Sequence, residues 1–194
     1  MKLSQYRGRA AFLLAAVLLI ALLAAVWAGQ NTPEAKFERN LKTVLTAYFT
    51  FPWDLSGLEA EEGTRPYTRA YMERACGGLL TESGFRSLER EATISTAGML
   101  VGTGYHTAVR SMTLTPPQDL RGQLDFTVVL FWGPDEGPGE TGELTLTGRA
   151  QMDPEREGLV SHVKLTLPES RDALIALKTR LWVDPAPPGG SPQG

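Results

Sequence analysis

Hydrophobic and polar residues follow three different patterns along this chain, and the patterns divide it into three parts. Residues 10–28 are an unbroken run of uncharged, mostly aliphatic residues. From about Thr32 to Arg90, apolar residues recur every three or four positions, which is the period of an amphipathic helix. From Thr93 to Leu167, stretches rich in β-branched residues alternate between apolar and polar side chains, as strands do. The sequence therefore predicts an apolar segment followed by an α+β domain.

The apolar run is long enough to cross a membrane. At about 1.5 Å per helical residue, the segment Ala10–Ala28 nearly spans the roughly 30 Å of a bilayer's hydrocarbon core. The tail before it carries Lys2, Arg7 and Arg9 and no acid, whereas residues 29–34 carry no basic residue. The positive-inside rule then keeps residues 1–9 in the cytoplasm. We expect a single-pass anchor in the cell membrane, with the main domain outside the cytoplasm.

A cleaved signal peptide is the alternative interpretation of this run. Val26 and Ala28 are small enough for a signal peptidase, and cleavage before Gly29 would release a secreted protein. The run exceeds the roughly 7 to 15 apolar residues usual in signal peptides. Trp27 also suits the membrane interface. Both interpretations place the domain outside the cytoplasm.

Helices are predicted on both sides of the strand region. Thr32-Pro33-Glu34 is a helix start, with a capping hydroxyl, proline at the first position and an acid in the first turn. The apolar stripe that follows reaches about Thr50, and Phe51-Pro52-Trp53 ends it. The same reasoning predicts helices from about 64–66 to 77–78, at 82–90 and at 169–182.

About five strands are predicted, at Thr93–Val101, Tyr105–Thr115, Gly122–Trp132, Thr141–Met152 and Gly158–Leu167. In the fourth, Leu144 and Leu146 alternate with Thr145, Thr147 and Arg149, the pattern of a sheet with one solvent-exposed face. In the fifth, the polar side is expected to carry Val160, His162 and Lys164. Gly- and Pro-rich turns at 133–139 and 153–158 predict antiparallel neighbours.

These elements form one domain, at residues 29–183. Its length of about 155 residues is enough for one domain with its own core. The tail at 184–194 is rich in Pro and Gly, cannot bury apolar surface, and is expected to be disordered.

Charge and cysteine content narrow the function classes. Without the three basic residues of the tail, 16 basic and 22 acidic residues remain, a net charge of −6. Such an acidic domain lacks the basic patch of a nucleic-acid binder. Cys76 is the only cysteine, so no intramolecular disulfide can form. With two histidines far apart in sequence, neither zinc nor iron–sulfur ligation is expected, and no metal or cofactor is predicted.

The order of elements resembles a known fold. Amphipathic helices followed by an antiparallel sheet of long strands resemble the cone-shaped fold of nuclear-transport-factor-two-like (cystatin-like) proteins, over Thr32 to Leu167. The resemblance implies two or three helices against the concave face of a curved sheet. The helix predicted after Leu167 departs from the simplest version of this fold.

The anchor extends the resemblance. A basic cytoplasmic tail, one span and an exported domain of this fold resemble the inner-membrane assembly proteins of type IV secretion and conjugation machines. This resemblance implies an interaction module without catalytic activity, and a protein partner or self-association.

The sequence also leaves an enzyme open as the alternative. Polyketide cyclase-like and steroid isomerase-like proteins of the same broad fold use acid–base groups inside the cone. Here His106 and Asp125 are the candidate pair, and they would need to point into an apolar cavity that shifts their pKa values. A small apolar ligand bound in that cavity is the corresponding binding function.

For an interaction module, two sets of residues are the candidate binding positions. The first is the aromatic turn with Phe51 and Trp53. The second is the polar side of the last two strands, at Thr145, Thr147, Arg149, His162 and Lys164.

Overall fold

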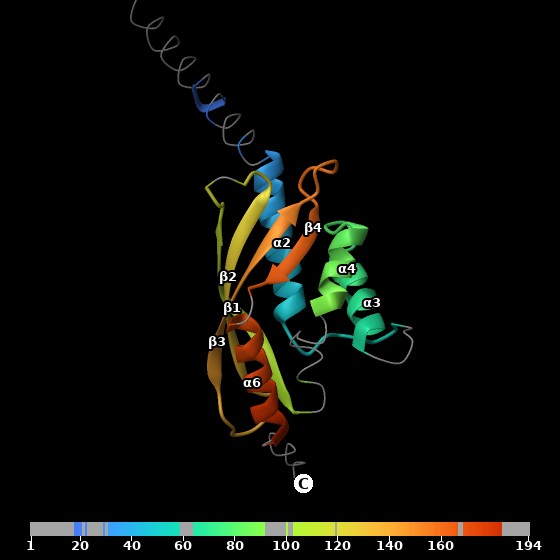
Figure 1. Cartoon of the computed structure of the whole chain (residues 1–194), viewed down its shortest axis with the longest axis vertical. Helices are drawn as coiled ribbons and strands as arrows, with labels where there is room; N and C mark the ends of the chain where they lie inside the picture. Colours follow the sequence, from blue (N-terminus) through green and yellow to red (C-terminus); the bar gives the residue numbers. More distant parts are fainter. Residues whose placement is uncertain are drawn as a thin grey trace, which may run out of the picture.

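The structure is a computed structural model that describes residues 18–20, 22, 29, 31–58, 64–91, 100, 103–118, 120–166 and 169–183. Helices lie before and after an antiparallel sheet, so the α+β class is confirmed (Figure 1). Its elements are, in chain order, α2 (Pro33–Phe49), α3 (Thr64–Cys76), α4 (Glu82–Glu91), β1 (Tyr105–Thr115), β2 (Gln123–Pro134), β3 (Gly142–Met152), β4 (Val160–Leu165) and α6 (Glu169–Val183). The predicted helices and the last four predicted strands are present, with boundaries shifted by no more than two residues.

The described sheet has four strands in the order β1-β2-β3-β4, each antiparallel to its neighbour. The strand predicted at Thr93–Val101 covers residues 93–99 and 101, which lie outside the described residues, and Leu100. Leu100 is helical and buried. In the described part of the chain the sheet therefore has one strand fewer than expected.

One face of the sheet, here called the core face, is covered by helices. The stripe predicted on α2 is buried: Phe37, Leu41, Val44, Leu45 and Tyr48. These side chains share one core with the inward residues of β2, such as Phe126 and Val128. Leu174, Leu177 and Leu181 of α6 complete the same core near Trp132, whose ring lies under the guanidinium of Arg180.

A β-bulge changes the facing of β4. Gln151 pairs with His162 but Met152 pairs with Val160, which leaves Ser161 as the extra residue. The extra residue reverses the alternation on one side of the bulge. Val160 is therefore completely buried, and its predicted place on the polar side with His162 and Lys164 is wrong.

The outer edge of β4 is closed by α4 and the turn before it. Leu80 forms a parallel bridge with Val160, and the Val163 amide donates to Ser87 Oγ at 3.0 Å. Ser87 in turn donates to the Gly84 carbonyl at 2.8 Å. Because unpaired strand edges invite association with other chains, these contacts remove β4 as a pairing edge.

The terminal predictions fall largely outside the described residues. This holds for the tail at 1–9, for most of the anchor Ala10–Ala28, and for the tail at 184–194. Within the part of the chain that is described, no helix is both long and apolar enough to span a bilayer. The described residues of the apolar segment, Leu18, Leu19, Ile20 and Leu22, are helical and between 59 and 66 % exposed.

Candidate functional site: the outer face of the sheet

The side of the sheet opposite the helices carries the outward residues of all four strands, and we call it the outer face. On β2 these are Asp125, Thr127, Val129 and Phe131, which alternate with the buried core residues. Glu143, Thr145 and Arg149 of β3 are exposed, so no described element covers this surface at these three positions. The outer face also includes Ser111, Thr113 and Thr115 of β1, Thr147 of β3, and His162 and Lys164 of β4.

The middle of the outer face is uncharged. The register places Ser111, Val129 and Thr145 in one row across three strands. The next row contains Thr113, Thr127 and Thr147. This centre therefore presents short side chains on a hydrogen-bonded sheet.

Ion pairs border this uncharged centre on both sides. At one end, Arg149 Nε and Nη2 donate to the two carboxylate oxygens of Asp125 at 2.6 and 3.1 Å. This bidentate contact raises the pKa of the Arg149 guanidinium. At the other end, Arg110 pairs with Glu143. Since both pairs are about half exposed, they contribute little stability and hold their charges at the rim.

Thr147 is partly shielded where β3 meets α6. The Thr147 amide donates to Ser170 Oγ at 2.8 Å, and the Ser170 hydroxyl lies 3.2 Å from the Thr147 carbonyl oxygen. Ser170 thereby satisfies β3 backbone groups beyond the end of β4. Of the two threonines predicted to bind, Thr145 is the exposed one.

His106 and Asp125 do not form the pair required by the enzyme alternative. Asp125 is opposite Thr115, nine positions along β1 from His106, a separation of roughly 30 Å at about 3.3 Å per residue. Both side chains lie on the outer face instead of in a cavity. Asp125 binds Arg149, while His106 Nδ1 lies 3.5 Å from Asp135 and its ring 5.7 Å from that of Phe131.

The aromatic turn has a structural place. Trp53 is only 7 % exposed and stacks on Tyr71, with ring centroids 4.6 Å apart and planes 7° apart. Phe51 is half-buried, and its backbone forms an antiparallel bridge with Thr107 of β1. These contacts fix the end of α2 to the sheet. The binding role expected for Phe51 and Trp53 stays a prediction.

His162 lies at a small cleft between β4 and α4. The cleft has a volume of about 170 Å³ and is lined by Ser87, Arg90, Glu91, His162, Val163 and Lys164. Burial, with the nearby charges of Arg90 and Lys164, lowers the pKa of His162. Burial raises the pKa of the Glu91 carboxyl, a residue that sequence reasoning did not select because nothing in its helix distinguishes it.

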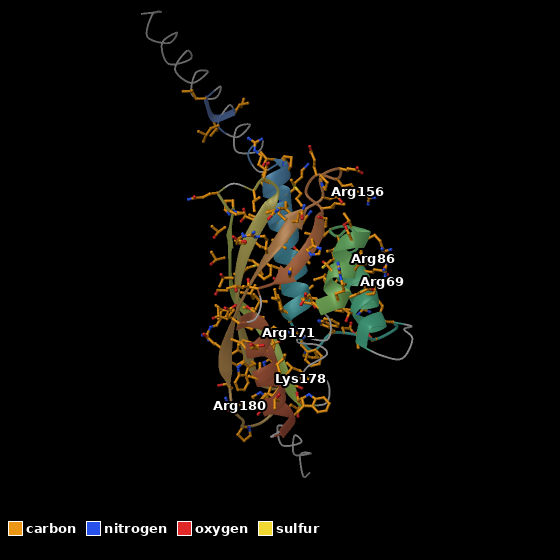
Figure 2. All side chains as sticks on the ribbon, in the orientation of Figure 1. Arg69, Arg86, Arg156, Arg171, Lys178 and Arg180 are labelled. Atoms are coloured by element: carbon orange, nitrogen blue, oxygen red, sulfur yellow. The ribbon has the colours of Figure 1, made fainter. Side chains whose placement is uncertain are left out.

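The helical side of the molecule differs from the outer face in its charge. Arg69 of α3 binds Glu73 on its own helix and Glu82 on α4, and Glu82 also pairs with Arg86. Figure 2 shows Arg69 and Arg86 together on this side. The two arginine contacts lower the pKa of Glu82 to about 2. This network joins α3 to α4 through charged, partly exposed side chains.

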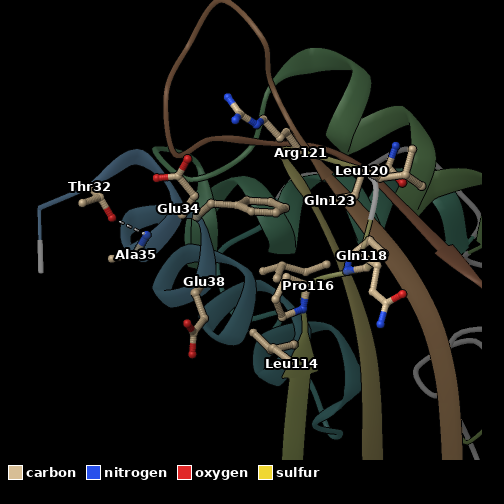
Figure 3. A pocket seen from close by; sticks show the side chains of 14 residues that line it. Thr32, Glu34, Ala35, Glu38, Leu114, Pro116, Gln118, Leu120, Arg121 and Gln123 are labelled. Atoms are coloured by element: carbon tan, nitrogen blue, oxygen red, sulfur yellow. Dashed lines mark hydrogen bonds between the residues drawn. The ribbon is translucent and has the colours of Figure 1, made fainter. Parts of the chain in front are cut away.

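A second hollow lies at the N-terminal end of α2. It has a volume of about 650 Å³ between the first two turns of α2 and the β1–β2 turn, and Figure 3 shows its walls. Sequence reasoning missed it because the two walls are some 80 residues apart in the chain.

As for metals, the described residues contain no group of three or more His, Cys, Asp or Glu side chains that could hold an ion.

Comparisons with known proteins add one structural neighbour. No protein-family model matches the chain, and no curated protein matches it. Among solved structures, the NMR solution structure of a transfer protein, TraH, from the Gram-positive conjugative plasmid pIP501 aligns with 71 % of this chain and 97 % of its own. The sequence identity is 9 % and the TM-score is 0.43. A likeness at this level supports no conclusion about fold or function.

Proposed function

We propose that this chain is a membrane-anchored, extracytoplasmic protein-interaction module that binds a partner protein through the outer face of its sheet. The observation that carries the proposal is the exposed, uncharged centre of that face, bordered by ion pairs. Protein interfaces have the same anatomy, with charged residues depleted at the centre and a polar rim around it. Thr145 lies at the centre, and Arg149 and Lys164 lie at the rim.

The facing of the side chains supports this assignment. Val129 is opposite Thr145 and is only half-buried, although it lies on a central strand. A partner that covers this row would remove apolar surface from water without burying an unpaired charge, since Asp125 and Arg149 already neutralise each other. The sheet is hydrogen-bonded throughout, so binding would order little backbone.

The anchor rests on the apolar segment. Leu18, Leu19, Ile20 and Leu22 are helical and mostly exposed. Four exposed leucine and isoleucine side chains this close together favour an apolar environment, and a lipid bilayer provides one. The net charge of −6 beyond residue 28 disfavours contact of the domain's outer face with an anionic membrane surface, which leaves that face to a protein.

The enzyme alternative receives no support from the placement of its candidate residues. His106 and Asp125 are at opposite ends of the outer face, and each already has an acidic or basic neighbour. The assignment to the nuclear-transport-factor-two-like fold stays a prediction that rests on the order of elements.

A charge placed at the centre of the outer face tests the proposal. We expect Thr145→Arg to abolish chemical crosslinking to the partner in intact membranes, since an unpaired charge would be buried in the interface. The matched control is Thr46→Arg, an exposed threonine on α2, which should leave crosslinking unchanged.

Three other outcomes have a defined meaning. A product between two copies of the chain that Thr145→Arg abolishes would identify the partner as a second copy. Loss of crosslinking in Thr46→Arg alone would move the interface to the helical side and contradict the proposal. A strictly monomeric chain with no recoverable product would also contradict it.

A further inference from the structure

The hollow at the N-terminal end of α2 has two walls of different origin. One wall is α2, with Thr32, Glu34, Phe37 and Glu38. The other is the β1–β2 turn and the strand ends beside it: Leu114, Pro116, Gln118, Leu120, Arg121 and Leu124. Figure 3 shows Glu34 and Arg121 on these opposite walls. The volume of about 650 Å³ lies in the range of small-molecule sites.

The floor of this groove is apolar. Phe37 is 2 % exposed, and Leu124 and Leu114 flank it from the sheet. At the rim, Leu120 is 43 % exposed, the most exposed large apolar residue described between β1 and β4. A leucine held in water at a turn contributes nothing to the core, so its apolar side chain is available for a ligand or a membrane.

Opposite charges flank the apolar floor. Among the described residues, neither Glu34 nor Arg121 takes part in a salt bridge, whereas Glu38 is bound to Lys42 at 2.7 Å. Glu34 and Arg121 lie on facing walls without pairing with each other. A ligand with one positive and one negative group and an apolar body would satisfy both charges and cover the floor.

The groove is also close to the apolar segment in the chain. Thr32, which caps α2 through the Ala35 amide at 3.2 Å, comes four residues after Ala28. Four residues reach at most about 14 Å. If Ala10–Ala28 is the anchor, the groove opens within the headgroup layer of the bilayer.

We infer that this groove binds the headgroup of a zwitterionic phospholipid whose positive group is a primary ammonium, as in phosphatidylethanolamine. The Arg121 guanidinium binds the phosphate, for which its planar fork is suited. The Glu34 carboxylate accepts hydrogen bonds from the ammonium. Leu120 and the floor around Phe37 contact the glycerol and the start of the acyl chains. This inference rests on the proposed anchor.

The ammonium distinguishes this site from general lipid contact. A primary ammonium has three N–H donors for Glu34, whereas the trimethylammonium of phosphatidylcholine has none. Because a charge-assisted hydrogen bond is roughly twice as strong as a neutral one, the site should prefer phosphatidylethanolamine over phosphatidylcholine by about tenfold.

The first test measures lipid retained by the full-length chain after gentle extraction from vesicles of equal phosphatidylethanolamine and phosphatidylcholine content, by native mass spectrometry. We expect one phosphatidylethanolamine per chain. The expected loss is about tenfold in Arg121→Ala and in Glu34→Gln. Arg156→Ala, on the exposed β3–β4 turn, is the matched control and should retain the lipid. Equal retention of both lipids, or no loss in the two groove variants, would overturn the inference.

A second test locates the turn relative to the bilayer. In a Cys76→Ala background, a fluorophore on Leu120→Cys should be quenched by headgroup-labelled lipid. The same fluorophore on Glu136→Cys, in the β2–β3 turn at the opposite end of the sheet, should not. Equal quenching at the two positions would contradict the headgroup site.

Carbonate extraction of the same vesicles separates the two proposals. A chain that stays in the membrane with an unquenched Leu120 probe contradicts the headgroup site and leaves the anchor and the outer-face interaction standing. A chain released by carbonate contradicts the anchor, and the headgroup site with it.

Discussion

The two faces of the sheet are built from alternate residues of the same strands, yet one face forms the core and the other remains open to a partner. On β2, Phe126, Val128 and Leu130 are buried under the helices, while Thr127, Val129 and Phe131 point outward and remain half-buried. The inward residues determine the stability of the domain. The outward residues lie on an equally rigid backbone but carry little of the core, so they can be selected for contact with a partner.

The largest expected effect is a comparison of two phenylalanines on β2. Phe126 is 2 % exposed and shares the core with α2, so Phe126→Ala should lower the free energy of unfolding by about 3 to 5 kcal/mol. Phe131→Ala on the outer face should cost roughly a third as much, since its ring is only half-buried. Urea denaturation of both variants measures the difference, and equal losses would show that the outer face is part of the core.

A smaller effect is expected where α4 closes the edge of β4. Ser87→Ala removes the acceptor of the Val163 amide and leaves that amide unpaired in a buried place. The expected cost is about 1 to 3 kcal/mol. Hydrogen exchange at Val163 should accelerate more than at Val128 in the centre of the sheet. Unchanged exchange at Val163 would show that water replaces the hydroxyl at no cost.

The ion pair between Arg149 and Asp125 on the outer face should contribute still less to the free energy of unfolding. Arg149 and Asp125 are about half exposed, and pairs of this kind contribute about 0.2 to 1 kcal/mol. A double-mutant cycle with Arg149→Ala and Asp125→Ala should give a coupling energy in that range, reduced by salt. A coupling well above it would mean that the pair supports the fold and does not merely border the interface.

The smallest expected effect is the dependence of stability on pH that His162 causes. Burial, with Arg90 and Lys164, lowers the pKa of His162 below its ordinary 6.5. As the pH falls, His162 is therefore protonated near pH 6.5 in the unfolded chain but only at a lower pH in the folded chain. Stability should fall as the pH drops from about 6.5 through the folded-state pKa. His162→Gln should lose this part of the pH dependence. An NMR titration that placed the pKa of His162 above 6.5 would reverse the sign.

The alternation of apolar and polar residues was sufficient to predict the helices, four strands and the α+β class. It could not predict the bulge at Ser161, because an extra residue in a strand leaves no mark in the sequence, and so Val160 was assigned to the wrong face. It also could not predict the separation of His106 and Asp125, which depends on the register between β1 and β2.

The candidate site was predictable only in part. The facing of Thr145, Arg149 and Lys164 follows from strand periodicity. The burial of Trp53 was not predictable, because an aromatic residue after a helix can be exposed or buried, and its stacking on Tyr71 is a tertiary contact. The groove of Glu34 and Arg121 depends on a tertiary contact that no local pattern encodes.

Site-specific photo-crosslinking in native membranes tests the central claim most directly. A photoreactive residue would be placed at Thr145 or Thr127 on the outer face, and at Thr46 on α2 or Thr179 on α6 for comparison. The account predicts a crosslinked protein product from the two outer-face positions and none from the two helical positions. Products from Thr46 or Thr179 with none from Thr145 and Thr127 would contradict the assignment of the outer face as the interaction surface.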